Sequence, residues 1–298
     1  MVDTIAHHGR QASRSPYIVQ RMTDRDEIRA ALTPDRSYAA YALAQLEPGL
    51  FELSDWYTAV GPAGRALVVH SRGGLGRALF VHGDLQAVDA ILCLHPGPRF
   101  TFGSLRLEHR PIVQRHFIVT QSATMLRMSV TPETLTPAAG DAVRLDGGDI
   151  SRINRLYSAE GGGTSYRRQH IENGVYCGVI VDGRLASIAG THAISPAEGI
   201  AVVGNVFTHP SFRNRGLATI ATGAVTQALL PQCPLVTLTV EAENSSAVRV
   251  YQRLGYRPEC TLHETPLIRK EPLGLLSMAR RLIAGRRGHR EGVEVVIR

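Results

Sequence analysis

The chain has 298 residues, of which 44% are apolar and 20% charged, a composition typical of water-soluble globular proteins. A chain of this length is longer than a single hydrophobic core usually supports, which favours two domains. No run approaches the ~20 apolar residues that a membrane span needs, and residues 1–16 lack the apolar core of a secretory signal. We therefore expect a cytoplasmic protein without a membrane partner.

The cysteine and histidine spacings argue against a metal site and against a disulfide framework. The four cysteines lie far apart without a CxxC pair, and the twelve histidines show no HxxxH or HExxH spacing. We expect no bound metal and reduced thiols.

The net charge of +7 is concentrated at the C-terminal end, where six arginines face two glutamates from residue 273 onward. Lys270 is the only lysine, so arginine is the default cation and a single arginine carries little functional information. A basic tail over 271–298 could contact nucleic acid, but no aromatic residues or nucleic-acid motif accompany it. We favour a solvated tail and regard nucleic acid as an unlikely partner.

The first half of the chain predicts a mixed α/β domain over residues 1–130, from apolar periodicity and turn residues. The expected elements are helices over 24–32 (capped by Thr23), over 37–46 and after Asp84, a hairpin of 66–70 and 78–82 around a glycine-rich turn, and strands at 100–107 and 125–130.

A proline-containing stretch of small residues, 131–140, predicts the linker to a second domain over 141–270. Its expected elements are a helix over 149–157, a glycine-rich loop at 161–163, a hairpin of 176–181 and 185–192, and a buried strand at 200–208. Both halves follow a helix-then-hairpin order, which a duplicated domain would show.

The segment after the buried strand carries the first chemical signal. A turn over 213–218 leads into a helix whose apolar residues, from Leu217 to Leu229, recur at helical spacing. Free N–H groups and the positive dipole end make such a helix start an anion site. Gly216 lets a ligand approach the backbone, and Arg213 and Arg215 add charge, so a phosphate site and an ordinary strand-to-helix turn are both open here.

A second block strengthens the phosphate interpretation. A strand at 236–240 is followed by Glu241 and by a short helix that Asn244 caps. Tyr251 lies on the apolar face of that helix, and Gly255 suits its left-handed C′ position.

Together, Arg213-x-x-Gly216-x-Ala218 and Asn244-x-x-Ala247-x-x-x-Tyr251-x-x-x-Gly255-Tyr256 resemble the two signature motifs of the GNAT superfamily of N-acetyltransferases, in order and in spacing. The resemblance covers about 125 residues. It implies an α/β fold with a mixed sheet, the GNAT acyl-CoA N-acyltransferase fold, in two tandem domains. The first domain would be a degenerate copy, because a strand follows its glycine-rich stretch 72–76 where the motif requires a helix.

The resemblance implies acetyl-CoA as the acyl donor and a direct transfer of its acetyl group to a primary amine of a small molecule or peptide. Tyr251 matches the family's acid, which protonates the departing thiolate. The positions that match the family's cofactor contacts are Val206, Phe207 and Thr208 for the pantetheine arm, Arg213, Asn214, Arg215, Gly216, Leu217, Ala218 and Thr219 for the pyrophosphate, and Asn244 for the pantetheine or thioester region.

Several points stay open at this stage. Glu241 leads Glu160 and His192 as the candidate general base, because it follows a strand next to the cofactor-binding block. A catalytically silent acyl-CoA sensor is the alternative function, and a nucleic-acid-associated protein ranks third. We expect one cofactor site per chain, and a homo-oligomer is compatible with the sequence.

Overall fold

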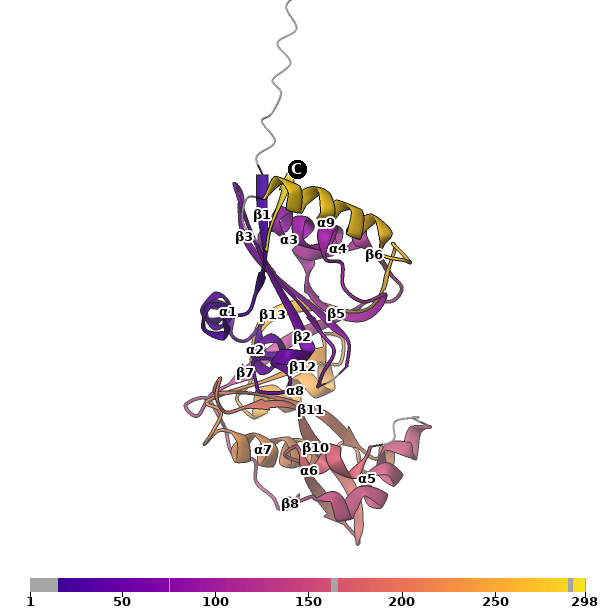
Figure 1. The fold of residues 1–298 in the computed structure, drawn as a ribbon. Coiled ribbons are helices and arrows are strands. Elements are labelled where there is room, and N and C mark those ends of the chain that lie inside the picture. Colours follow the sequence, from indigo (N-terminus) through magenta and orange to yellow (C-terminus); the bar gives the residue numbers. More distant parts are fainter. Residues whose placement is uncertain (1–15, 75, 162–165, 289–291, 298) are drawn as a thin grey trace, which may run out of the picture.

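The computed structural model describes residues 16–74, 76–161, 166–288 and 292–297, and its strands form one mixed sheet. The sheet has 14 strands, in the order β14-β1-β2-β3-β4-β5-β13-β7-β12-β11-β10-β9-β8, with β6 paired to β13. Figure 1 shows the sheet running the length of the molecule, with the N-terminal half at one end and the C-terminal half at the other. Within the described residues, no helix is long and apolar enough to cross a membrane.

The N-terminal half contributes a strand, two helices, a strand meander and two further helices. These elements are β1 (Pro16–Met22), α1 (Arg25–Leu32), α2 (Ala40–Ala44), β2 (Ser54–Gly61), β3 (Gly64–Ser71), β4 (Ala78–Gly83), α3 (Leu85–Leu94), β5 (Phe100–Arg106) and α4 (Arg110–His116). The predicted hairpin of β3 and β4 and the Asp84 cap of α3 are confirmed. The predicted Thr23 cap is wrong, because the Asp24 carboxylate accepts from the N–H groups of Asp26 and Glu27.

The C-terminal half repeats this plan. Its elements are β8 (Val143–Arg144), α5 (Ile150–Tyr157), α6 (Arg168–Glu172), β9 (Cys177–Val181), β10 (Arg184–Ser195), β11 (Ile200–Thr208), α7 (Leu217–Leu229), β12 (Leu235–Glu241) and α8 (Ser245–Arg253). Each half has one parallel strand pair, β4 with β5 and β11 with β12. The expected mixed α/β GNAT-type sheet is therefore present. Of the predicted loop 161–163, Gly162 and Gly163 lie outside the described residues.

The two halves exchange strands at the centre of the sheet. β7 (Ala123–Val130) precedes the predicted linker but pairs with β12, whereas β13 (Arg257–Arg269) follows it and pairs with β5, with β7 and with the short β6 (Phe117–Val119). The linker itself packs on the C-terminal half, where Thr136 N–H donates to the carbonyl of Leu254. The division into two domains at 131–140 remains a prediction. A strand from before this stretch pairs with the C-terminal half, and a strand from after it pairs with the N-terminal half.

Apolar side chains of both halves also share a core. One cluster combines Ile28, Leu43 and Trp56 of the N-terminal half with Val202 and Leu262 from the second half of the chain. On the opposite face of the C-terminal strands, α7 and α8 cover a second cluster. The two faces of the C-terminal sheet are thus covered differently, and the helices that carry the sequence motifs lie on one face only.

The predicted solvated tail is wrong for its described part. Residues 275–287 form α9 (Leu275–Arg287), which packs against α3, and β14 (Val293–Ile297) pairs with β1 at the edge of the sheet. Arg280 and Arg281 donate to the carbonyl groups of Cys93 and Leu94 at the C-terminal end of α3, where cations are stabilised. These two arginines therefore dock α9 onto the N-terminal half.

Candidate active site

The site begins where β11 and β12 separate. Residues 200–203 of β11 pair with residues 235–238 of β12, and beyond this point the two strands diverge. β11 continues to Thr208 while its other edge stays paired to β10, with Phe207 opposite Ile188. Val206, Phe207 and Thr208 therefore lie on a strand whose β12-facing edge has no strand partner. Such an edge offers backbone N–H and C=O groups to an extended ligand.

The turn before α7 has the backbone expected of an anion site. Gly216 is the N-cap of α7 in the left-handed region (φ 76°), and Asn214 is also left-handed (φ 62°). Among the described residues no side chain caps this helix, so its first-turn N–H groups stay available to a ligand. Gly216, Arg213, Asn214 and Arg215 are exposed, Ala218 and Thr219 are partly buried, and Leu217 is buried in the core.

The two arginines of this turn are held by local contacts. Arg213 forms an ion pair with Glu160 (2.7 Å) and donates to the carbonyl of Thr208. Arg215 lies over the ring of Phe212, 5.6 Å from its centroid. Glu160 therefore neutralises Arg213 in this structure, which weakens Glu160 as a candidate base.

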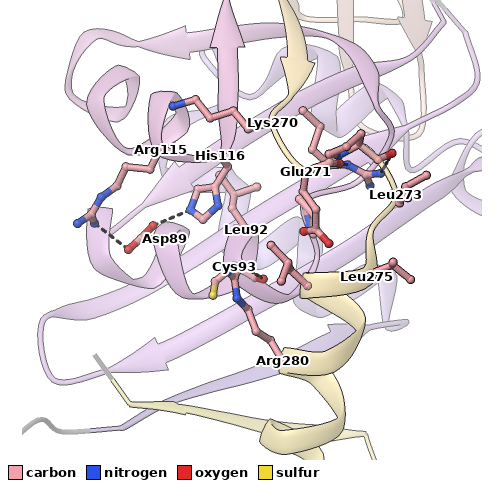
Figure 2. A pocket seen from close by; sticks show the side chains of 14 residues that line it. Asp89, Leu92, Cys93, Arg115, His116, Lys270, Glu271, Leu273, Leu275 and Arg280 are labelled. Carbon is pink, nitrogen blue, oxygen red and sulfur yellow. Dashed lines mark hydrogen bonds and ion pairs between the residues drawn. The ribbon is translucent and has the colours of Figure 1, made fainter.

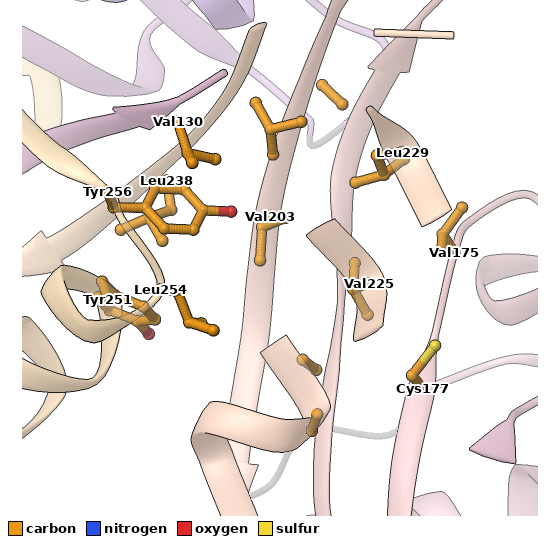
Figure 3. Packing of buried hydrophobic residues seen from close by; sticks show 14 of the residues in the cluster. Val130, Val175, Cys177, Val203, Val225, Leu229, Leu238, Tyr251, Leu254 and Tyr256 are labelled. Atoms are coloured by element: carbon orange, nitrogen blue, oxygen red, sulfur yellow. The ribbon is translucent and has the colours of Figure 1, made fainter. Parts of the chain in front are cut away.

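Helix α8 places Tyr251 in an apolar cluster beside Leu254 and Tyr256 (Figure 3). Leu217 belongs to the same cluster, and Val206 packs against it. Asn244 caps α8 as predicted: its Oδ1 accepts from the N–H of Ala247 (3.1 Å). The Tyr251 side chain is only 7% exposed, and burial raises the pKa of its hydroxyl to about 12. Among the described residues its hydroxyl has no hydrogen-bond partner, in contrast to Tyr256, whose hydroxyl bonds Thr226 Oγ1 (2.7 Å).

Glu241 ends β12 opposite Met125 of β7, and its side chain is exposed. Val240 packs in the cluster under α8, and successive strand residues point to opposite faces. Glu241 and Tyr251 thus lie on opposite faces of the sheet at the divergence of the strands.

A polar network around Asn205 was not foreseen from the sequence. Asn205 Nδ2 donates to the hydroxyl of Tyr176, and Asn205 Oδ1 accepts from the Tyr166 hydroxyl and from His192 Nε2 (3.0 Å). His192 Nδ1 in turn accepts from the hydroxyl of Tyr41 (2.7 Å). His192 is therefore a neutral imidazole in a fixed tautomer, and burial lowers its pKa further. Both of its ring nitrogens are occupied.

The corresponding strand pair of the N-terminal half lacks an anion turn. β4 leads directly into α3, and the Asp84 carboxylate accepts from the N–H groups of Gln86 and Ala87. A negative side chain thus occupies the helix start that is left open in the C-terminal half. The Asp84 carboxylate would repel a phosphate at the start of α3, which favours the prediction of a single cofactor site.

A separate cleft of about 800 Å³ lies beside α3, α4 and α9 (Figure 2). Asp89 lines it and binds Arg115 (2.9 Å) and His116 (2.6 Å). This cleft lies on the N-terminal half, away from the divergence of β11 and β12, and none of the predicted site residues lines it.

Comparison with known proteins relates the motif-bearing region to a family and the chain to a fold. Residues 151–256 match the model of the acetyltransferase (GNAT) family, and no curated protein matches the chain. A Drosophila melanogaster protein has 14% identity over 84% of this chain and 98% of its own (TM-score 0.58). A GCN5-related N-acetyltransferase from Kribbella flavida has 20% identity over 79% and 96% (TM-score 0.54).

A tandem GNAT protein from the clavulanic acid biosynthesis pathway has a similar fold over 86% of this chain and 99% of its own, with 11% identity and a TM-score of 0.50. At these sequence identities the structural similarity establishes the fold alone. The match to the family model concerns the region that carries both sequence motifs. The chain accordingly has the mixed α/β GNAT fold, and its C-terminal region, residues 151–256, belongs to the GNAT acetyltransferase family.

Proposed function

We propose that the C-terminal half transfers the acetyl group of acetyl-CoA to a primary amine of a small molecule or peptide. This proposal depends on one observation, which is that three structural features lie around the same apolar cluster. The separated edge of β11, the uncapped start of α7 and the buried Tyr251 of α8 border the same apolar cluster. The edge would bind the pantetheine arm and the helix start the pyrophosphate.

In the proposed reaction, a neutral amine attacks the thioester carbonyl while a backbone N–H near Val206 stabilises the oxyanion. The C–S bond then breaks, and Tyr251 hydrogen-bonds or protonates the thiolate. A pKa of about 12 keeps the Tyr251 hydroxyl protonated at physiological pH. The same apolar surroundings raise the basicity of a thiolate released beside it, so the two groups stay matched.

We propose Glu241 as the general base, acting through water. Its side chain is exposed on the face of the sheet opposite Tyr251, which is the face from which an acceptor would approach. Glu160 is engaged by Arg213, and both ring nitrogens of His192 are hydrogen-bonded, so both are weaker candidates.

The proposal is tested by following thiol release from acetyl-CoA with polyamines, aminoglycosides, amino acids and peptides as acceptors. Acceptor-dependent release with formation of the N-acetylated product would support it. Tight acetyl-CoA binding without release for any acceptor would contradict it and favour an acyl-CoA sensor.

A further inference from the structure

A cavity of about 290 Å³ lies where α2 faces the central strands of the sheet. Most of its wall is apolar or aromatic, including Tyr38, Leu79, Phe80 and Phe102. Arg127 and Glu264 enter it from the exchanged strands β7 and β13, and His192 enters from β10. A largely apolar pocket with a few charged groups is the usual form of a small-molecule site.

Arg127 is the unusual member of this wall. Its side chain is among the largest fully buried ones, with 1% exposure, and its Nε and Nη1 atoms have no hydrogen-bond partner in the described structure. Within the described ranges no carboxylate oxygen lies within 4.0 Å of the guanidinium, which contacts the face of the Tyr41 ring at 4.9 Å. Glu264 lines the same cavity and interacts with Arg127 through its charge, but two guanidinium nitrogens stay without a hydrogen-bond partner. Buried donors of this kind are unfavourable when unsatisfied, so they are available to an anionic ligand.

The cavity lies beside the divergence of β11 and β12. Arg127 is paired with Thr239, the first residue of β12 beyond the last parallel pair, Val203 with Leu238. The Thr239 hydroxyl is also buried without a partner. Leu238 and Val240 pack towards Tyr251, so the alternation along β12 places Thr239 on the other face.

On β11, the corresponding position is covered by the ring of His192, which comes from the neighbouring strand β10. Its ring covers Gly204 so closely that a Cβ added there would lie 2.4 Å from the ring. Gly204 is the first residue of β11 beyond the parallel pairs. Two residues that line the cavity, Arg127 and His192, therefore lie next to the two strands where these separate, on the face opposite α7 and α8. The acceptor of the proposed reaction would enter on this face.

We propose that this cavity is the acceptor pocket and that it selects an amine bearing a carboxylate on an apolar or aromatic body, an amino-acid-like substrate, with Arg127 binding the carboxylate. This inference rests on the proposed acetyl transfer. A guanidinium can grip a carboxylate through two parallel N–H bonds. Glu264 lines the same cavity, and burial raises the pKa of its carboxyl while the charge of Arg127 lowers it. An ammonium group bound there would stabilise the charged carboxylate, which favours a ligand that carries an amine as well as a carboxylate over a simple anion such as phosphate.

The experiment compares amines that differ only in the carboxylate: phenylalanine with phenethylamine, tyrosine with tyramine, and leucine with isoamylamine. Acetylation is measured with wild type, Arg127→Met, Arg127→Lys and, as a matched control, Arg257→Met, whose arginine is exposed on β13. Thermal stabilisation by each compound and by inorganic phosphate gives a readout that does not require turnover.

We expect wild type and Arg257→Met to prefer the carboxylate member of at least one pair by about tenfold or more in kcat/KM. Arg127→Met should lose the preference, Arg127→Lys should keep part of it, and acetyl-CoA affinity should not change. The melting temperature without ligand checks that Arg127→Met is folded, and the loss of the carboxylate preference in a folded variant is the readout that a merely structural arginine would not give.

The outcomes separate this inference from the proposed function. Equal acetylation of both members of every pair by wild type, or a preference that survives in Arg127→Met, overturns the pocket assignment while acetyl transfer stands. Stabilisation by phosphate that equals that by the amino acids and is lost in Arg127→Met also overturns it, because phosphate bound at the start of α7 would stabilise the variant as well. If no amine is acetylated but the amino acids stabilise wild type and not Arg127→Met, the pocket assignment holds and the proposed reaction fails.

Discussion

Replacing Gly255 with alanine tests whether the predicted linker positions α8. Gly255 follows this helix in the left-handed region (φ 89°), and a Cβ added there would lie 1.8 Å from the carbonyl oxygen of Thr134. Left-handed backbone costs a non-glycine residue about 1–2 kcal/mol. The overlap is with backbone, which cannot rotate away, and its displacement adds about 1–3 kcal/mol. We therefore expect Gly255→Ala to lower the free energy of unfolding by roughly 2–5 kcal/mol.

The matched control is Gly183→Ala in the hairpin of β9 and β10. Gly183 is also left-handed (φ 72°), but nothing lies within 4 Å of an added Cβ. Only the backbone cost of about 1–2 kcal/mol should remain. Urea denaturation, with the m-values compared, measures both variants. Equal destabilisation of the two variants would refute the packing of residues 131–140 against α8.

Three further predictions concern the anion turn, a buried histidine and the base. Gly216→Ala has open space around its Cβ, so it should cost about 1–2 kcal/mol of stability but weaken acetyl-CoA binding in calorimetry; unchanged affinity would argue against the turn as the phosphate site. Burial lowers the pKa of His70 from 6.5 to about 4, so the unfolded chain takes up this proton first as the pH falls. The contribution of neutral His70 to the free energy of unfolding should be complete above pH 6.5 and fall by about 3 kcal/mol towards pH 4. In urea titrations His70→Gln should lose less stability over this range. An identical pH dependence in the variant and in wild type would contradict this role of His70. Glu241→Gln should lower kcat while acetyl-CoA affinity stays unchanged, and an unaffected pH–rate profile with unchanged kcat would eliminate Glu241 as the base.

The motif-bearing part of the fold could be predicted from sequence because its signals are local. The strand at 200–208, the glycine turn before α7 and the Asn244 cap of α8 each depend on neighbouring residues. The strand exchange could not be predicted in this way. β7 and β13 are ordinary apolar strands, and no local pattern says which half of the chain a strand will join.

The same limit explains the site residues that the sequence did not reveal. Arg127 is a single charge within an apolar strand, which is a weak signal, and its meaning depends on β12 and α2 lying beside it. The network of Tyr41, His192 and Asn205 joins residues separated by more than 150 positions at its ends. The docking of the basic tail could not be predicted either, because it depends on a tertiary contact in which Arg280 and Arg281 donate to carbonyl groups of α3.

The most direct test of the account is the turnover of Tyr251→Phe against Tyr256→Phe, with acetyl-CoA and the best acceptor. Both tyrosines lie in the apolar cluster under α8, but within the part of the chain that the structure describes only the Tyr256 hydroxyl is hydrogen-bonded, to Thr226. If Tyr251 is the acid, its variant should lose about 100-fold or more in kcat with unchanged acetyl-CoA affinity. Tyr256→Phe should lose stability and retain kcat. Full turnover in Tyr251→Phe would contradict the proposed mechanism.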